Sequence, residues 1–391
     1  MSYWNNFITK LSNSVIIVAM KNEEITKLIE SILGKGAVIV APLLGGMMNV
    51  SYIVEDKNKK QYVLYLPTEQ ANEMVDRPIE KENQRIVYEL GLTSKNVYFD
   101  EKTGIKMNEF IEGYSLDRIA DFDYEKIAVL FKKLHQSIML SRIDYNPFGR
   151  FENIYEKEAL SYEKEPSTMY SHLREFVFSK KNYLESQIKT LCHNDAQRSN
   201  ILKSSDDKYY FIDFEFMGNN DPIYDIATFG NGVVSEGRKL LDVYFSNKPT
   251  EDQIKRYYLW RMFVSLQWYN VAITKHYRGE GEKHHFNFMD VANHFLFNAK
   301  DAYDGYMLEI KEKSEIEDTI RLIEVTLDKI RHFLRKDGGD CEFVSFQDGV
   351  VFVRMRGACD GCAYAGADIK ELVEVILQEE VPGVLEVRLA E

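Results

Sequence analysis

Residues 191–200 of this chain read LCHNDAQRSN, and residues 212–215 read IDFE. Both stretches adjoin short apolar runs of strand length, at Thr190–Cys192 and Tyr209–Phe214. The first stretch contains the pattern HxDxxxxN, in which one loop presents both a carboxylate and an amide. Together the two stretches predict one polar site at the ends of two neighbouring strands.

The side chains of this site suit phosphoryl transfer from ATP, which depends on positioning and charge more than on covalent chemistry. Asp195 can orient and deprotonate an acceptor hydroxyl, while Asn200 and Asp213 offer the oxygen ligands that Mg²⁺ requires. The alternative is that His193 and Asp195 only cap a turn between the strands. The context favours catalysis, because a Gly-rich hairpin and a connector precede the motif.

The residues around the motifs predict a two-lobed α+β fold. Strands are expected at 37–41, 50–55, 61–66, 96–99 and 104–110, with a helix at 78–90. From 116 to about 311 the pattern is mostly helical, with helices at 124–139, 251–275 and 290–308. A charged break at 311–313, followed by a capping-box pattern at 314–317, predicts a domain boundary there.

Residues from about 25 to 305 resemble the choline/ethanolamine kinase branch of the aminoglycoside phosphotransferase superfamily. The resemblance rests on 212–227, which read IDFEFMGNNDPIYDIA, and on the loop GGMMN at 45–49. It implies an N-terminal extension at 1–24, then a protein-kinase-like fold with an N-lobe at 25–112 and a helical C-lobe at 113–312. It also implies ATP and Mg²⁺ as cofactors.

By this resemblance Asp195 is the catalytic base, and Asn200 and Asp213 are magnesium ligands. Glu215 would shape the site or assist metal binding, whereas Asp225 would be a structural acid at a helix start. The nucleotide would be bound by a glycine loop, a helix glutamate and a hinge, which comprise Gly45, Gly46, Asn49, Glu80, Asn108 and Ile111.

The third strand departs from the family pattern. Such kinases read like VLRIPG there, and the basic side chain contacts the phosphates and pairs with the helix glutamate. Here residues 63–68 read VLYLPT, so Tyr65 occupies that position and supplies no charge. Arg77, at the start of the helix, is a candidate substitute. If no other residue supplies this positive charge, the kinase-like part would transfer phosphate slowly or would only bind its ligand as a degenerate kinase.

Aromatic side chains are the evidence for the acceptor. A quaternary ammonium donates no hydrogen bonds, so proteins hold it with ring faces, each worth about 0.5–2 kcal/mol. Residues 257–269 read YYLWRMFVSLQWY and lie where choline kinases carry a choline-pocket tryptophan segment. Tyr224, Trp268 and Tyr269 are the predicted cage, with Trp260 as a weaker member. The alternative is that rings at helical spacing belong to the core.

The class of acceptor stays open. Ser265 and Val271 stand where the family carries an acid and a second tryptophan. Choline, ethanolamine or another amino alcohol, and an aminoglycoside-like polyamine are therefore all compatible with the sequence.

Residues 357–362 read GACDGC, a spacing that lets two thiolates bind one soft metal centre. Three interpretations compete. A structural zinc site would want four ligands, and no second CxxC or His pair lies in this segment. A thioredoxin-like redox pair would want a βαβ context, which is missing. The third interpretation, an iron–sulfur site, rests on a resemblance.

Residues from about 316 to 391 resemble the C-terminal domain of NifU-type iron–sulfur scaffold proteins. The match includes LRKDGGD at 334–340, VVFVRMRGACDGC at 350–362 and VPGV at 381–384. It implies a small α-β-β-α-β domain at 313–391 in which Cys359 and Cys362 ligate iron. Two thiolates cannot complete a four-iron cluster, so a homodimer would share it, and apo iron–sulfur proteins would receive it. Cys341 is expected to be an apolar strand residue.

Composition narrows the compartment and the partners. The net charge of −13 argues against a nucleic-acid partner, which would need a basic face. Four cysteines in 391 residues suit a reducing compartment, and no apolar run approaches the length of a membrane span. A cytoplasmic protein is expected.

The leading expectation is an ATP-dependent kinase for choline or ethanolamine, joined to a domain that binds or transfers an iron–sulfur cluster. One alternative is a cluster-assembly scaffold with a degenerate, non-catalytic kinase-like domain. The other is a kinase for another small hydroxylated amine, such as an aminoglycoside.

Overall fold

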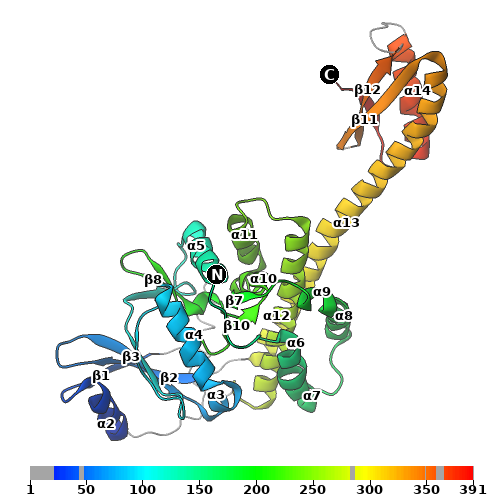
Figure 1. The fold of residues 1–391 in the computed structure, drawn as a ribbon. Coiled ribbons are helices and arrows are strands. Elements are labelled where there is room, and N and C mark those ends of the chain that lie inside the picture. Colours follow the sequence, from blue (N-terminus) through cyan, green and yellow to red (C-terminus); the bar gives the residue numbers. More distant parts are fainter. Residues whose placement is uncertain (1–21, 44–47, 282–286, 348, 358–364, 391) are drawn as a thin grey trace. The chain divides into compact units, whose positions relative to one another are not determined.

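The computed structural model describes residues 22–43, 48–281, 287–347, 349–357 and 365–390. The chain divides into two compact units, Met1–Gly305 and Tyr306–Glu391. Helix α13 (Phe288–Leu334) contributes residues to both units (Figure 1). None of the helices among the described residues is long and apolar enough to cross a membrane.

The first unit begins with a five-stranded antiparallel sheet in the order β1-β2-β3-β5-β4 (Figure 1). Its strands are β1 (Val38–Leu43), β2 (Asn49–Glu55), β3 (Gln61–Pro67), β4 (Asn96–Phe99) and β5 (Lys106–Glu109). Apolar side chains of one sheet face pack with Ile25 and Ile29 of α2 (Asn22–Leu33). After α3 (Glu69–Met74), α4 (Arg77–Glu89) begins at the N-cap Asp76, with Pro78 in its first turn.

The pairing of β3 with β5 determines which side chains share a face. Tyr65 lies directly opposite Lys106, and Leu64 lies opposite Met107. Successive residues of a strand point to opposite faces of the sheet. Leu64 and Met107 belong to the core against α2, so Tyr65 and Lys106 together face the other way.

The rest of the first unit is mainly helical, as predicted. Its helices are α5 (Tyr124–His135), α6 (Pro147–Arg150), α7 (Lys157–Tyr162), α8 (Thr168–Phe178), α9 (Lys181–Glu185), α10 (Pro222–Phe229), α11 (Val234–Tyr244) and α12 (Glu251–Tyr277). Helix α12 is the central one, because most of its residues from Tyr257 to Thr274 are buried. A helix that is apolar on all sides is typical of a position inside a core.

Two small sheets frame the motifs that the sequence singled out. Strands β6 (Gly113–Ser115), β8 (Ile201–Ser204) and β9 (Tyr209–Phe211) form one, and β7 (Thr190–Cys192) pairs with β10 (Gly218–Asn220) in the other. The predicted strand at 209–214 was too long. It ends at Phe211 because Asp213 has a φ of 67°, which lies outside the β region.

The second unit confirms the predicted α-β-β-α-β order. After α13 come β11 (Gly339–Gln347), β12 (Val350–Gly357), α14 (Ala365–Glu380) and β13 (Glu386–Leu389). Strands β11 and β12 are antiparallel, whereas β13 lies parallel to β12, a pairing that needs the crossover through α14. The apolar stripe of α13 packs in this core through Ile323, Leu327, Ile330 and Leu334.

The charged segment 311–313 does not interrupt the helix, because α13 continues through it, whereas the two compact units divide between Gly305 and Tyr306. No glycine or proline lies between Met307 and Leu334, and Lys and Glu, which dominate 309–313, are good helix formers. A run of charge therefore does not end this helix.

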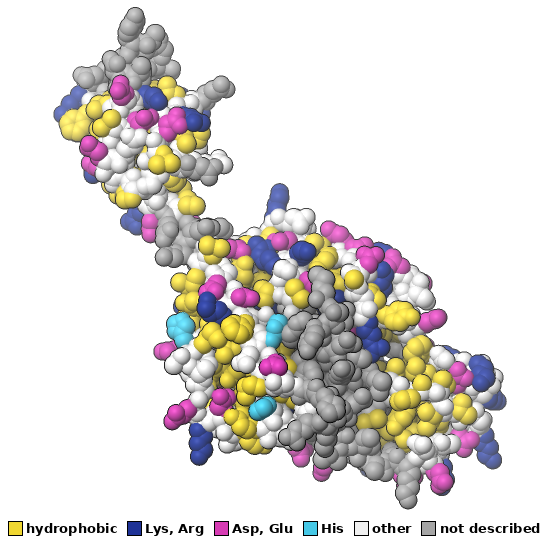
Figure 2. Space-filling view, turned by 180° about the vertical axis from the view of Figure 1, so that it is seen from behind, with side chains coloured by type: hydrophobic (Ala, Val, Ile, Leu, Met, Phe, Trp, Pro, Cys, Tyr) yellow, Lys and Arg dark blue, Asp and Glu magenta, His cyan; other side chains and the backbone are white. Residues whose placement is uncertain are grey.

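The surface charge of the molecule is mixed. On the face shown in Figure 2, acidic and basic side chains of the described residues intermingle.

Candidate functional site

The loop between β7 and β8 brings Asp195 and Asn200 together. The Asn200 amide Nδ2 donates to Oδ2 of Asp195 at 2.9 Å and to its backbone carbonyl at 2.8 Å. Gln197 donates to Oδ1 of Asp195 at 2.6 Å. Burial raises the pKa of Asp195 to about 7, which places its titration near neutral pH. A carboxyl group with such a pKa suits a general base.

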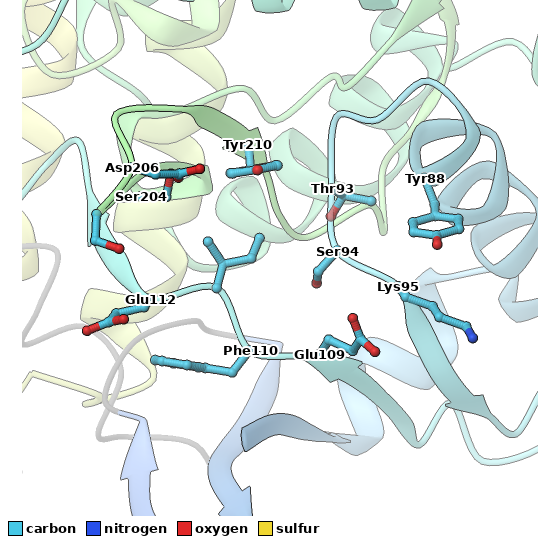
Figure 3. A pocket seen from close by; sticks show the side chains of 12 residues that line it. Tyr88, Thr93, Ser94, Lys95, Glu109, Phe110, Glu112, Ser204, Asp206 and Tyr210 are labelled. Carbon is cyan, nitrogen blue, oxygen red and sulfur yellow. The ribbon is translucent and has the colours of Figure 1, made fainter. Parts of the chain in front are cut away.

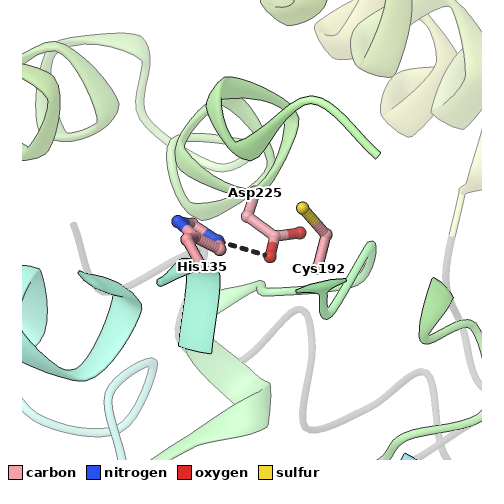
Figure 4. A group of neighbouring side chains, drawn as sticks. All are labelled: His135, Cys192 and Asp225. Atoms are coloured by element: carbon pink, nitrogen blue, oxygen red, sulfur yellow. Dashed lines mark hydrogen bonds and ion pairs between the residues drawn. The ribbon is translucent and has the colours of Figure 1, made fainter. Parts of the chain in front are cut away.

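Asp225 of α10 accepts hydrogen bonds from the backbone of the same loop. Its Oδ2 accepts from the His193 backbone N–H at 2.7 Å, and its Oδ1 accepts from the Asn194 N–H at 2.6 Å. The His135 Nε2 lies 3.1 Å from Oδ2 of Asp225 (Figure 4). Asp225 therefore acts on the backbone of the loop and not on a substrate.

His135, Cys192 and Asp225 converge in Figure 4 with an arrangement that could suggest a metal site. Each group already has a protein partner, however. Both carboxylate oxygens of Asp225 are engaged, and His135 Nδ1 lies 3.1 Å from the Tyr244 hydroxyl. The Cys192 thiol contacts the carbonyl oxygen of Asn220 at 3.3 Å, and burial raises its pKa well above the usual range. This cluster braces the loop.

Asp213 is placed beside the loop by the backbone. The Ile212 N–H donates to the Asn200 carbonyl at 3.0 Å, and Asp213 then takes a left-handed φ of 67°. Non-glycine residues in this region are strained by about 1–3 kcal/mol and are common at functional sites. Burial raises the pKa of Asp213, and its Oδ1 has no hydrogen-bond partner among the described residues.

Glu80 of α4 pairs with two cations close to Asp213. It accepts from Arg77 at 2.6 Å and also from the Lys106 ammonium. Lys106 Nζ lies 3.9 Å from Oδ1 of Asp213 and 5.1 Å from the ring centroid of Tyr65. Lys106 was not among the residues predicted from the sequence. The only signal for it was its place opposite Tyr65, which depends on the strand register.

Glu215 links the loop after β9 to β2. Its Oε1 accepts from Asn49 Nδ2 at 2.8 Å and lies 3.5 Å from Arg77 Nη1. Its Oε2 is buried without a hydrogen-bond partner in the described part of the chain. Burial, and secondarily the charge of Asp213, raise the pKa of Glu215 to about 8. The predicted residues Gly45 and Gly46 lie outside the described residues.

This donor set fits Mg²⁺. Two buried carboxylate oxygens, Asp213 Oδ1 and Glu215 Oε2, have no hydrogen-bond partner among the residues described. The amide of Asn200 lies on the neighbouring loop. Hard oxygen donors are what Mg²⁺ prefers, and a divalent cation would relieve the crowding of acids that raises their pKa values.

The predicted hinge residues occupy two different environments. The side-chain oxygen of Asn108 accepts from Gln84 and Asn96, at 2.8 Å each, so this side chain ties β5 to α4 and β4. Ile111 lines a pocket of about 300 Å³ (Figure 3). Neither Asp195 nor Asp213 lines that pocket, which is therefore separate from the carboxylate group.

The predicted cage residues lie in separate packing clusters. Tyr224 is buried, with its ring 5.1 Å from Trp260 and 5.5 Å from Tyr145. Trp268 stacks on Phe295 of α13, at 5.9 Å between ring centroids. Along a helix, eight residues correspond to about 12 Å, so Trp268 lies well beyond Trp260 on α12.

Tyr269 packs in a third place. Its ring lies 4.8 Å from Tyr170, and its hydroxyl lies 3.3 Å from Glu163. Beside the Tyr224 cluster there is instead a cation, because the Arg150 guanidinium lies 5.4 Å from the Tyr145 ring and 4.8 Å from the Phe216 ring. Its Nε and Nη2 are buried without a hydrogen-bond partner among the described residues.

In the second unit, Cys359 and Cys362 lie outside the described residues. The segment that precedes them is held at Gly357, whose φ is 68° and where a Cβ would approach the Gly338 carbonyl oxygen to 2.4 Å. Only glycine fits this contact. Asp340 is fixed next to it by Arg331 at 2.7 Å, which lowers the pKa of Asp340 below its usual range. Cys341 is buried in the core.

Two protein families account for most of the chain. A model of choline/ethanolamine kinases matches residues 40–258, more than half of the chain, and a model of the NifU-like domain matches residues 323–388. Protein LicA of Haemophilus influenzae is 27% identical over 257 residues, which are 61% of this chain and 74% of LicA. A crystal structure of LicA in complex with AMP is 26% identical with a TM-score of 0.58, and the match covers 73% of this chain and 98% of that one.

The C-terminal unit has relatives of a different kind. The NFU1 iron–sulfur cluster scaffold homolog of Drosophila persimilis is 36% identical over 69 residues, which are 17% of this chain and 24% of that protein. The chain thus spans about a quarter of this relative. From the fold, the geometry of the site and these matches, the chain belongs to the choline/ethanolamine kinase family and carries a NifU-like domain after the kinase-like unit.

Proposed function

We propose that the first unit transfers the γ-phosphoryl group of ATP to the hydroxyl of a small amino alcohol, choline or ethanolamine. The observation that carries this proposal is a cluster of carboxylates and cations with an amide at one place. Asn200 donates to Asp195, Lys106 lies 3.9 Å from Asp213, and Glu80 accepts from both Lys106 and Arg77. A relative bound to AMP supports the choice of an adenine nucleotide.

Each side chain of the site has a separate role in this reaction. An oxygen of Asp195 accepts the proton of the acceptor hydroxyl, and Asn200 holds that carboxylate in place. Asp213 and Asn200 would hold Mg²⁺, which when bound neutralises charge on the phosphates. Glu215, through Asn49, ties β2 to the metal side of the site.

The acceptor is proposed from the family alone, because the predicted contacts Tyr224, Trp268 and Tyr269 lie in three separate packing clusters. One observation favours a second candidate, a hydroxylated amine such as an aminoglycoside. The Arg150 guanidinium lies against Tyr145 beside Tyr224, where its charge would repel a trimethylammonium group. Its free N–H groups would instead donate to a substrate oxygen.

The test is ADP release by the purified chain with ATP and Mg²⁺. The expected result is turnover with choline or ethanolamine, lost in Asp195→Ala and unchanged in Cys359→Ser. Turnover with an aminoglycoside alone would favour the second acceptor. If the chain binds no ATP, the kinase-like unit is a degenerate binder and the proposal fails.

For the second unit we propose that Cys359 and Cys362 bind an iron–sulfur cluster, shared between two chains and passed to apo iron–sulfur proteins. The NifU-like match and the observed fold support it. Anaerobic treatment with iron and sulfide should give a brown, oxygen-sensitive chromophore that is lost in Cys362→Ser. A colourless product with bound zinc would contradict the proposal.

A further inference from the structure

We propose that Lys106 of β5 supplies the positive charge for the nucleotide phosphates that Tyr65 of β3 cannot supply. This inference rests on the proposed kinase function and names a phosphate-binding residue for it. It also explains how a site without a basic residue on β3 can still hold a polyanion.

The sheet register makes the relocation possible. Tyr65 and Lys106 are directly opposite in the antiparallel β3–β5 pair. Side chains at opposite positions leave the same face, with Cβ atoms about 4.5–5.5 Å apart. A long side chain from either position can therefore bring its terminal group to the same region.

The contacts of Lys106 are those of a group aimed at the phosphate site. The side chain is buried, yet its ammonium is paired with Glu80 and lies 3.9 Å from Asp213 Oδ1. Both partners belong to the site, one from α4 and one from the loop after β9. An ammonium has three N–H donors, and Glu80 takes one of them.

The other cation of the cluster is occupied elsewhere. Arg77 donates from Nε and Nη2 to the Asn72 side chain, at 3.1 and 2.9 Å. Its Nη1 is taken by Glu80 at 2.6 Å, with Glu215 at 3.5 Å. The guanidinium thus holds α3 and α4 together around Glu80, which leaves Lys106 as the cation that faces Asp213.

Tyr65 has a defined part in this arrangement. Its ring lies against the Lys106 ammonium, with 5.1 Å between Nζ and the ring centroid. A half-buried ring beside an ammonium gives a favourable cation–π contact. Tyr65 and Lys106 therefore form one unit across two strands.

The experiment compares the parent with Lys106→Met and Lys60→Met by calorimetric titration with ATP·Mg²⁺ and with adenosine. Lys60 is a matched control, because it pairs with Glu109 at 2.5 Å and lies 5.5 Å from the Tyr62 ring, but is exposed. Lys106→Met should lower the affinity for ATP about ten- to a hundredfold and leave that for adenosine unchanged. Lys60→Met should bind both ligands as the parent does.

Equal affinity of Lys106→Met and the parent for ATP would overturn the inference, and so would an equal loss for ATP and adenosine, which indicates a structural role. In case Lys106→Met does not fold, a second variant exchanges the two residues (Tyr65→Lys with Lys106→Tyr) and keeps both charge and composition. It should bind ATP within about tenfold of the parent, since the register lets a lysine on either β3 or β5 reach the same region. A folded swapped variant that does not bind ATP overturns the inference.

These outcomes separate the inference from the function on which it rests. A parent chain that binds no ATP ends the proposed function. A parent that binds ATP, with a Lys106→Met variant that binds it equally well, ends only the role of Lys106.

Discussion

The loop at 193–200 and the strand pair β3–β5 both present charged groups to the same candidate site, but by different means. In the loop, Gln197 and Asn200 position Asp195 within a few residues of sequence. In the sheet, Lys106 is positioned by residues far from it in sequence, Tyr65 and Glu80. The loop depends on a fixed spacing of residues in the sequence. A charge on a sheet face does not, because it can come from either of two paired strands.

The largest expected effect tests the loop. Asp195→Asn removes the proton acceptor, and we expect kcat to fall by about 10²–10⁴-fold with ATP affinity retained. ADP release and nucleotide titration measure the two quantities. Asp207→Asn is the control, because Asp207 is an exposed partner of Lys126. A rate equal to that of the parent would remove Asp195 from the mechanism.

The next effect tests what holds the loop. Asp225→Ala leaves the backbone N–H groups of His193 and Asn194 without their acceptor, and we expect a loss of about 3 kcal/mol in the free energy of unfolding. Urea unfolding followed by tryptophan fluorescence does not report on the second unit, because residues 306–391 contain no tryptophan, whereas Trp260 and Trp268 lie in the first unit. Asp304→Ala, which breaks an exposed pair with Lys300, should change stability by less than about 1 kcal/mol. Equal losses in the two variants would contradict a bracing role.

A smaller effect tests the sheet side. Glu80→Gln keeps the shape of the side chain but removes the charge that holds Lys106 and Arg77. We expect kcat/KM for ATP to fall about tenfold. Glu89→Gln, which affects an exposed pair with Arg85 on the same helix, should leave it unchanged. If Glu80→Gln has no effect, Lys106 is positioned without it.

The last effect is a pH dependence, which is small over any one pH unit. Burial raises the pKa of Asp195 to about 7 and that of Glu215 to about 8, so the folded chain keeps protons that the unfolded chain has released. Without Mg²⁺, the stability of the first unit should therefore fall as pH rises from about 5 to 8, by roughly 1 kcal/mol per pH unit for each of the two groups, and for Glu215 alone above pH 7. Glu215→Gln should flatten the upper part of this fall. Stability that rises with pH would contradict the raised pKa values.

The parts of the site that sequence could predict are those within one motif. The spacing of Asp195 and Asn200 indicated their proximity, and the structure brings them within hydrogen-bond distance. The aromatic run at 257–269 indicated a cage, but burial of α12 distributes Trp268 and Tyr269 among other helices. Helical spacing shows which rings share a helix face and not which neighbour each ring meets.

The sequence by itself determined both families, the kinase-like fold, the small C-terminal fold and the loop that carries Asp195. These follow from local patterns of spacing and hydrophobicity, which act within a few residues. The tertiary structure alone decided that Lys106 stands beside Asp213, and that Trp268 and Tyr269 meet different neighbours. Strand register and the neighbours of a helix face depend on packing between residues far apart in the sequence, so no single stretch of sequence contains them.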